Sequence, residues 1–177
     1  MAAYKRIILK LSGEALKSEG DLFDFDKIRE TADMLRRITE MGIEVGIVIG
    51  AGNIWRGRQG GKMDRVRADQ MGMLATTINA LALEDTFKQN GLDAVAMTAV
   101  EMNAFAEQYT IRNAIAALES GRVVIFGCGL GAPFFSTDTA AVLRAAEIEA
   151  DAALFAKNVD GVYDSDPKKN PDAKRFT

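Results

Sequence analysis

The chain contains no histidine among its 177 residues and only one cysteine. The lack of histidine excludes Ser-His-Asp triads, Cys-His pairs and histidine-based zinc sites. A single cysteine excludes an internal disulfide framework. Any chemistry must therefore use lysine, arginine, carboxylates, hydroxyls, backbone N–H groups or a weakly held metal such as magnesium. These groups suit phosphoryl transfer, in which the protein mostly positions the reactants and neutralises their charge.

Long apolar runs and an excess of positive charge are also absent. No stretch approaches the roughly 18 apolar residues of a membrane span, so we expect no membrane association. The net charge of −3 argues against a nucleic-acid partner, which would require a basic face. The start "MAAYKRIILKLSGEAL" lacks a long apolar region with a cleavage signal, so we expect a cytoplasmic protein.

The remaining composition is that of an ordinary globular domain. Apolar residues make up 48% and charged residues 27% of the chain, and proline is scarce, with three in all. A length of 177 residues is enough for one well-buried domain and short for two. We therefore expect a single domain over residues 1–177.

Strand and helix patterns alternate along this domain. Ile28, Ala32, Leu35, Ile38 and Met41 share one helix face, and Gly42 ends that helix. The nearly continuous apolar run at 43–50 is typical of a parallel strand that is buried on both faces. The alternation predicts a three-layer αβα sandwich with a mostly parallel central sheet. The expected strands are 4–12, 43–50, 93–97, 122–127 and 152–157, and the expected helices are 27–41, 66–88, 110–121 and 138–150.

Ligands of open parallel sheets gather at the carboxyl ends of the strands, where this chain carries unusual residues. The first strand ends in Lys10, Ser12 and Gly13, which suits either a phosphate site or a polar turn. The second is followed by "GAGNIWRG" (50–57), whose small residues and Arg56 suit an anion. A tight turn with a solvated arginine is the alternative. We expect Trp55 to pack rather than to stack on a base.

The segment "GCGLGA" (127–132) nominally matches a dinucleotide-binding fingerprint. That fingerprint should open a helix directly after the first strand. Here Pro133, Phe134 and Phe135 intervene, so the dinucleotide interpretation is weak. The loop instead ends in hydroxyls at a helix N-terminus, which favours an anion site. Asp138 either caps this helix or holds a catalytic lysine, and the two roles are compatible.

Three weaker features lie elsewhere. Within "KNVDGVYDSDP" (157–167), Tyr163 and Asp166 suit contacts with a base or ribose, and a surface hairpin is equally compatible. Asp69 suits a ribose hydroxyl or a solvated helix face. The basic cluster Lys62, Arg65 and Arg67 either lines the mouth of an anion site or is simply exposed. No Walker-type motif occurs, so this is not a P-loop protein.

Taken together, these segments resemble the bacterial uridylate kinases, which have the amino-acid-kinase fold. The resemblance spans about Tyr4 to Phe176. It rests on five segments in order, "YKRIILKLSGEAL", "VIGAGNIWRG", "ADQMGMLAT", "GAPFFSTDTAA" and "KNVDGVYDSDP".

The resemblance implies transfer of the γ-phosphoryl group of ATP to UMP in pyrimidine nucleotide synthesis. It implies Mg²⁺ with ATP, held mainly by the nucleotide phosphates, and no dedicated protein metal site, and it implies that Asp138 orients the catalytic cation. The catalytic residues it implies are Lys10, Arg56 and Asp138. The implied ATP-binding residues are Lys10, Leu11, Ser12, Gly13, Gly52, Arg56, Lys157, Asn158, Tyr163 and Asp166, with Lys157 and Asn158 as alternatives for one contact. The implied UMP-binding residues are Ala51, Asp69, Leu130, Gly131, Ala132, Pro133, Phe134, Phe135, Ser136 and Thr137.

The resemblance also implies a cytoplasmic homohexamer with UTP inhibition and GTP activation. The family's effector segment is expected near Ser18–Phe23, where "SEGDLF" matches it poorly. Ala51 replaces the middle glycine of the family's loop, which requires a negative φ at Ala51.

The expected parts are a UMP-binding and oligomerisation part at about 1–135 and the start of an ATP-binding part at about 136–177. Relatives extend beyond Thr177 and complete the nucleotide-binding half there, so the fold is expected to be C-terminally incomplete. We expect weak or absent kinase activity from a chain that ends at Thr177.

Two alternatives to UMP kinase remain at the level of sequence. One is a kinase of the same fold that acts on another small acceptor, such as carbamate or an amino-acid carboxylate. The other is a non-catalytic pyrimidine-nucleotide sensor.

Overall fold

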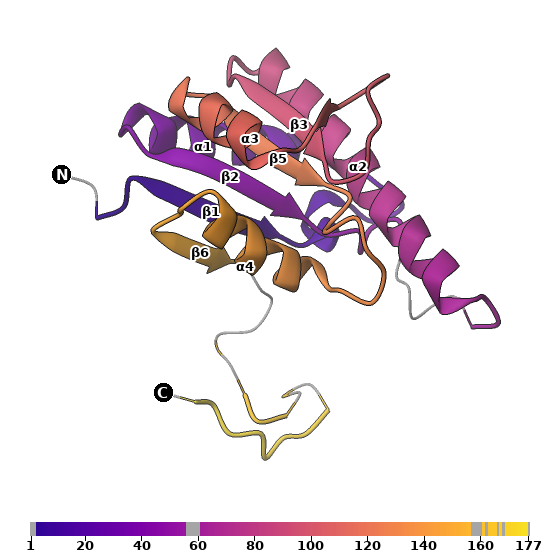
Figure 1. Ribbon diagram of the computed structural model, residues 1–177. Coiled ribbons are helices and arrows are strands. Elements are labelled where there is room, and N and C mark those ends of the chain that lie inside the picture. The colour runs from indigo at the N-terminus through magenta and orange to yellow at the C-terminus, as the bar shows by residue number, and fades with distance from the viewer. Residues whose placement is uncertain are drawn as a thin grey trace.

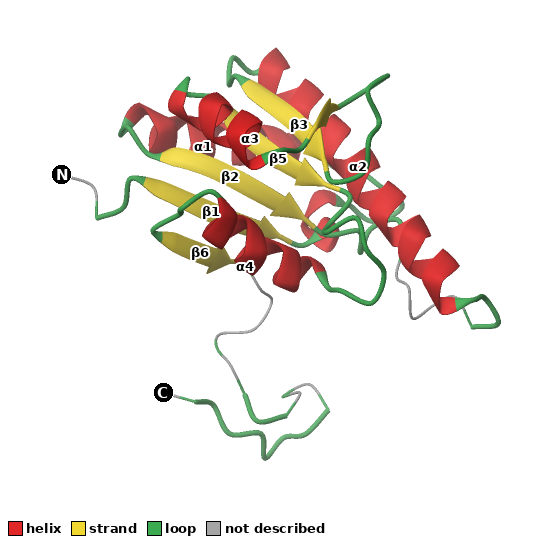
Figure 2. Ribbon diagram, viewed as in Figure 1, coloured by secondary structure: helices red, strands yellow, loops and turns green. Residues whose placement is uncertain are grey.

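The computed structural model describes residues 3–55, 61–156, 161, 163–165, 167 and 169–176. Within these residues the chain forms a six-stranded sheet in the order β4-β3-β5-β2-β1-β6 (Figures 1 and 2). Every neighbouring pair of strands is parallel, which confirms and extends the predicted mostly parallel sheet. The strands are β1 (Arg6–Leu11), β2 (Glu44–Ile49), β3 (Ala94–Thr98), β4 (Glu107–Gln108), β5 (Val123–Gly127) and β6 (Ala152–Phe155).

Helices cover both faces of the sheet, as expected for a three-layer sandwich (Figure 2). α1 and α2 pack on one face, and α3 and α4 pack on the other. Because side chains alternate along a strand, the two faces of β1 divide between two cores. Ile7 joins the core under α1 and α2, and Ile8 joins the core under α3 and α4. The helices are α1 (Phe25–Glu40), α2 (Arg65–Gln89), α3 (Ile111–Glu119) and α4 (Thr137–Glu147), with the short 3₁₀ helix η1 (Gly13–Leu16) after β1.

Each α-helix is preceded by an N-cap residue whose side chain accepts a hydrogen bond from the backbone N–H of the residue three positions later. Such caps satisfy donors that the first helical turn leaves unpaired. The capping residues are Asp24, Asp64, Thr110 and Ser136.

The apolar spacing of Met71, Leu74, Ile78 and Leu81 correctly predicted a helix near 66–88, but of these residues only Leu81 packs against a core. Met71, Leu74 and Ile78 are exposed on α2. The buried positions of α2 are small or polar in its first half and include Leu83 and Phe87 in its second half. α2 is therefore apolar on two sides, which a single periodicity cannot resolve.

Two elements were not predicted. Strand β4 has two exposed, polar residues, so neither apolar alternation nor β-propensity marks it. η1 directly follows Ser12 and occupies part of the turn after β1. Within the described ranges, no helix is long and apolar enough to cross a membrane.

Candidate functional site

The carboxyl ends of β1, β2 and β5 lie side by side at the middle of the sheet, because these strands are consecutive neighbours. The loops that follow them are in close contact. A Cβ atom on Gly50 would lie 3.3 Å from the Gly13 nitrogen and 3.6 Å from Thr137 Oγ1. The structure thus brings together three of the four predicted strand ends.

Lys10 is the charged group at the centre of this edge. It lies on β1 between β2 and β6, and its side chain is only 9% exposed. Its Nζ is 3.0 Å from Oδ1 of Asp138, which lies in the first turn of α4. Ser136, rather than Asp138, supplies the side-chain cap of that helix. Two roles were considered for Asp138, capping the helix and holding the lysine. The structure shows Asp138 paired with the lysine.

The glycine loop, which we define as residues 50–53, follows β2 against the start of η1. Ala51 is not among the described non-glycine residues with positive φ, so the alanine is accommodated as required. Its carbonyl accepts the N–H groups of Ile54 and Trp55, both at 2.9 Å. Arg56, the expected phosphate clamp, lies outside the described residues.

The acceptor loop, which we define as residues 128–135, connects β5 to α4. Cys128 and Phe134 have φ values of 64° and 71°, in a region that non-glycine residues rarely adopt. The N–H of Cys128 donates to Oγ1 of Thr76 on α2 at 2.8 Å, and this bond is buried. Burial raises the pKa of the Cys128 thiol, so this cysteine is not an activated nucleophile. The dinucleotide interpretation would require a helix directly after the glycines. The structure instead has this loop there, and α4 begins only at Thr137.

Asp69 of α2 holds the far end of the acceptor loop. Its Oδ2 accepts the N–H of Phe134 at 2.9 Å, and Nε of Arg65 donates to both of its oxygens. The hydrogen bond from Phe134, with help from Arg65, lowers the pKa of Asp69 below its usual value. The Arg65 guanidinium also lies 5.7 Å from the centre of the Phe134 ring. Arg65 is therefore paired with Asp69 through Nε while 57% of its side chain stays exposed.

A cavity of about 150 Å³ opens between α2, the glycine loop and the acceptor loop. Most of the residues predicted to surround UMP line it. They are Ala51, Asp69, Leu130, Ala132, Phe135, Ser136 and Thr137.

Among the described residues of the acceptor loop, Gly131, Pro133 and Phe134 do not line this cavity. The sequence reasoning also missed lining residues on α2. Gly72, Met73 and Thr76 follow Asp69 at spacings of three, four and seven, so continuing its helix face would have found them. Trp55, which also lines the cavity, packs as expected, with its Nε1 donating to the Ala68 carbonyl at 2.8 Å.

The expected ATP-side residues beyond the sheet are only partly described. Tyr163 forms an isolated antiparallel bridge with Arg175, which fits the hairpin alternative. Lys157, Asn158 and Asp166 lie outside the described residues. The described part of the chain contains no cluster of three acidic, cysteine or histidine residues that could hold a metal ion.

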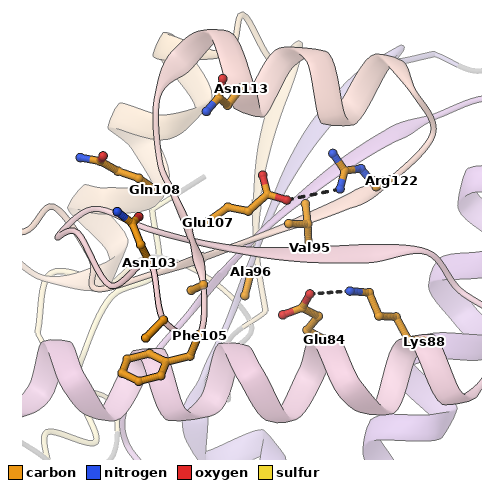
Figure 3. A pocket seen from close by; sticks show the side chains of 12 residues that line it. Glu84, Lys88, Val95, Ala96, Asn103, Phe105, Glu107, Gln108, Asn113 and Arg122 are labelled. Atoms are coloured by element: carbon orange, nitrogen blue, oxygen red, sulfur yellow. Dashed lines mark hydrogen bonds and ion pairs between the residues drawn. The ribbon is translucent and has the colours of Figure 1, made fainter.

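A larger cavity, of about 650 Å³, lies away from these loops beside β4 (Figure 3). Its charged side chains are paired with each other, Glu84 with Lys88 at 2.6 Å and Glu107 with Arg122 at 3.6 Å. The smaller cavity is the better candidate site, because it lies at the carboxyl ends of parallel strands and is lined by Thr137, the neighbour of the Asp138 that pairs with Lys10. Nothing in the sequence analysis pointed to the larger one.

The fold and this site define a member of the amino acid kinase family. The model of that family matches residues 5–177, so the chain belongs to it.

Two solved structures in this family are closely similar to the chain. A UMP kinase from Ureaplasma parvum is 41% identical, with a TM-score of 0.89, over 99% of this chain and 76% of that one. A UMP kinase from Bacillus anthracis is 44% identical, with a TM-score of 0.88, over 97% of this chain and 72% of that one. The chain is thus shorter than both of these proteins.

Proposed function

We propose that the chain is a UMP kinase, which transfers the γ-phosphoryl group of ATP to UMP and yields ADP and UDP. One observation carries this proposal. Nearly buried Lys10 is paired with Asp138, the neighbour of cavity-lining Thr137, in a chain 41% and 44% identical to two UMP kinases. The same-fold alternatives and the sensor have no comparable support.

The chemistry needs no general base, which suits a chain without histidine. The attacking oxygen belongs to the phosphate of UMP, which is already ionised at neutral pH. A new P–O bond forms to that oxygen, and the bond between the γ-phosphorus and its bridging oxygen breaks, so that ADP leaves. The difficulty is to bring two anions together, and positioned cations and N–H donors reduce that repulsion.

In this proposal Lys10 neutralises charge on the transferring group, and Asp138 holds Lys10 in place. The glycine loop and residues 10–13 serve the ATP phosphates, together with Arg56. The acceptor loop, Ala51, Asp69 and Thr137 serve UMP. The contacts that support these roles are the convergence of the three loops and the lining of the cavity.

Magnesium is proposed to enter with ATP, because this ion is usually bound by one or two carboxylates together with substrate phosphates. Asp138 offers one such carboxylate, 41% exposed, at the site. The bound ion would neutralise phosphate charge and orient the phosphates. The donor set fits a metal held mainly by nucleotide rather than by a protein cage.

The proposal is tested by screening acceptors with ATP and Mg²⁺ and following ADP release. UMP should give a clearly larger signal than CMP, glutamate or carbamate. Equal signals from all four acceptors would contradict a UMP kinase and favour another acceptor.

The assembly, regulation and cellular location of the chain are further proposals, which rest on the resemblance to the family. We propose a cytoplasmic homohexamer with UTP inhibition and GTP activation. An exposed apolar row on α2, formed by Met71, Leu74 and Ile78, supports a contact between copies, since such rows are seldom left in water.

A further inference from the structure

A buried amide lies behind the glycine loop and outside the cavity. Asn79 of α2 is fully buried, with apolar Ala80 and Leu83 of the same helix in the adjoining core. Burying an amide without hydrogen bonds is costly, so its presence on a core-facing helix position requires strong partners.

Those partners belong to the glycine loop. Nδ2 of Asn79 donates to the Gly50 carbonyl at 2.7 Å and to Oδ1 of Asn53 at 2.8 Å. In return, Nδ2 of Asn53 donates to Oδ1 of Asn79 at 2.9 Å and to the Leu22 carbonyl at 3.0 Å. All four amide N–H groups of the pair are thus used, and the two backbone carbonyls fix which way each amide points.

This pair holds both ends of the glycine loop against α2. Gly13 of η1 also packs closely against the loop, because a Cβ atom there would lie 2.5 Å from the Gly50 carbonyl oxygen, 2.6 Å from the Gly52 nitrogen and 2.6 Å from Asn53 Oδ1. The loop is therefore hydrogen-bonded to α2 and in close contact with η1. One helical turn earlier, Thr76 of the same helix holds the acceptor loop through the Cys128 N–H.

We propose that Asn79, paired with Asn53, is a positioning residue that fixes the glycine loop relative to the acceptor loop. It acts through Gly50 and Asn53, and not by touching a substrate. Because α2 anchors both loops, the helix sets the separation between the phosphoryl donor and the acceptor. The catalytic consequence rests on the proposed kinase function, whereas the fixing of the loop does not.

The test replaces Asn79 with leucine, which has a similar volume but no donors. Asn79→Leu should lower kcat by about tenfold to a hundredfold, the scale expected for misplaced reacting groups, with much smaller changes in KM. The N–H groups of Ile54 and Trp55, which bond to the Ala51 carbonyl, should exchange faster with deuterium. Asn90→Leu is the matched control, because the side-chain amide of Asn90 donates to the Thr86 carbonyl at the far end of α2, away from both loops. It should leave both measurements unchanged.

Asn53→Ala provides a second variant at a half-buried position, should Asn79→Leu fail to fold. It should reproduce the loss of kcat and the faster exchange. A folded variant with lower Tm but unchanged kcat and unchanged loop exchange would overturn the proposal, because Asn79 would then be merely structural. If the unsubstituted chain forms no UDP, the kinetic comparison does not apply, and loop exchange in the variants alone decides the positioning proposal.

Discussion

At the scale of single residues, the site depends on an ion pair at the edge of the core. Lys10 is 9% exposed and Asp138 is 41% exposed, so the pair is neither fully buried nor freely solvated. A lysine in such a place is costly without a partner, and Asp138 provides one. The pair holds a positive charge at the strand ends.

Replacing Lys10 with alanine should separate turnover from binding. We expect Lys10→Ala to lower kcat by at least about a hundredfold, the usual effect of removing one group that stabilises transition-state charge. UMP affinity, measured by calorimetry, should change little, because the cavity is lined by other residues. Lys5→Ala is the control, since Lys5 is 74% exposed just before the same strand. Full turnover in Lys10→Ala would contradict the assigned role.

Asp69 should make stability depend on acid pH. Its pKa is lowered in the folded state, chiefly by the Phe134 N–H, so it contributes stability above its unfolded pKa of about 4. That contribution is lost as the pH falls through the lower, folded pKa. Asp69→Asn should therefore flatten this part of the curve of Tm against pH, in melts from neutral pH to about pH 2. If Asp69→Asn leaves the acid part of the curve of Tm against pH unchanged, the hydrogen bond between Asp69 and Phe134 does not contribute to stability.

At the scale of elements, α2 does the most to shape the site. One side joins the core, a second lines the cavity through Asp69 and Thr76, and a third is exposed and apolar. The short helix η1 contributes through its backbone, which lies close to the glycine loop. Gly13 permits this, because any side chain there would meet backbone atoms of that loop.

Gly13→Ala should destabilise the fold and push η1 away from the glycine loop. A Cβ atom at 2.5 Å from the Gly50 carbonyl forces backbone to move, which typically costs about 1–3 kcal/mol. Denaturant unfolding measures this loss. Gly72→Ala is the control, because its Cβ atom would meet only the Trp55 ring at 3.8 Å and alanine favours the helix. Equal stability of both variants would show that the loops adjust freely.

At the scale of the whole molecule, α2 carries an exposed apolar row that joins neither core. Met71, Leu74 and Ile78 are 38%, 52% and 49% exposed and repeat at helical spacing along α2. Within the chain they stabilise little, and the proposed contact between copies would bury them.

Ile78→Glu should therefore shift the assembly toward smaller species without unfolding it. Light scattering after size exclusion measures the mass, and circular dichroism checks the fold. Val142→Glu is the control, because Val142 is 57% exposed on α4 and lies outside the row. An unchanged mass for Ile78→Glu would remove α2 from the proposed interface.

The sequence by itself determined the layered architecture, because strand and helix periodicities are local and long. It also identified the strand ends that carry Lys10, the glycine loop and Thr137, since parallel strands place their carboxyl ends at one edge. It did not predict β4, whose two polar residues give no pattern, or the outward direction of Met71 on a helix apolar on two sides.

Only the tertiary structure decided how the loops are held. Asp138 faces Lys10, Thr76 bonds to Cys128, and Asn79 bonds to Gly50 across intervals of 128, 52 and 29 residues. A polar residue on a core-facing helix position looks unfavourable in the sequence until its partner is known. That partner depends on which strand lies beside which, and strand order is a long-range property that local periodicity does not contain.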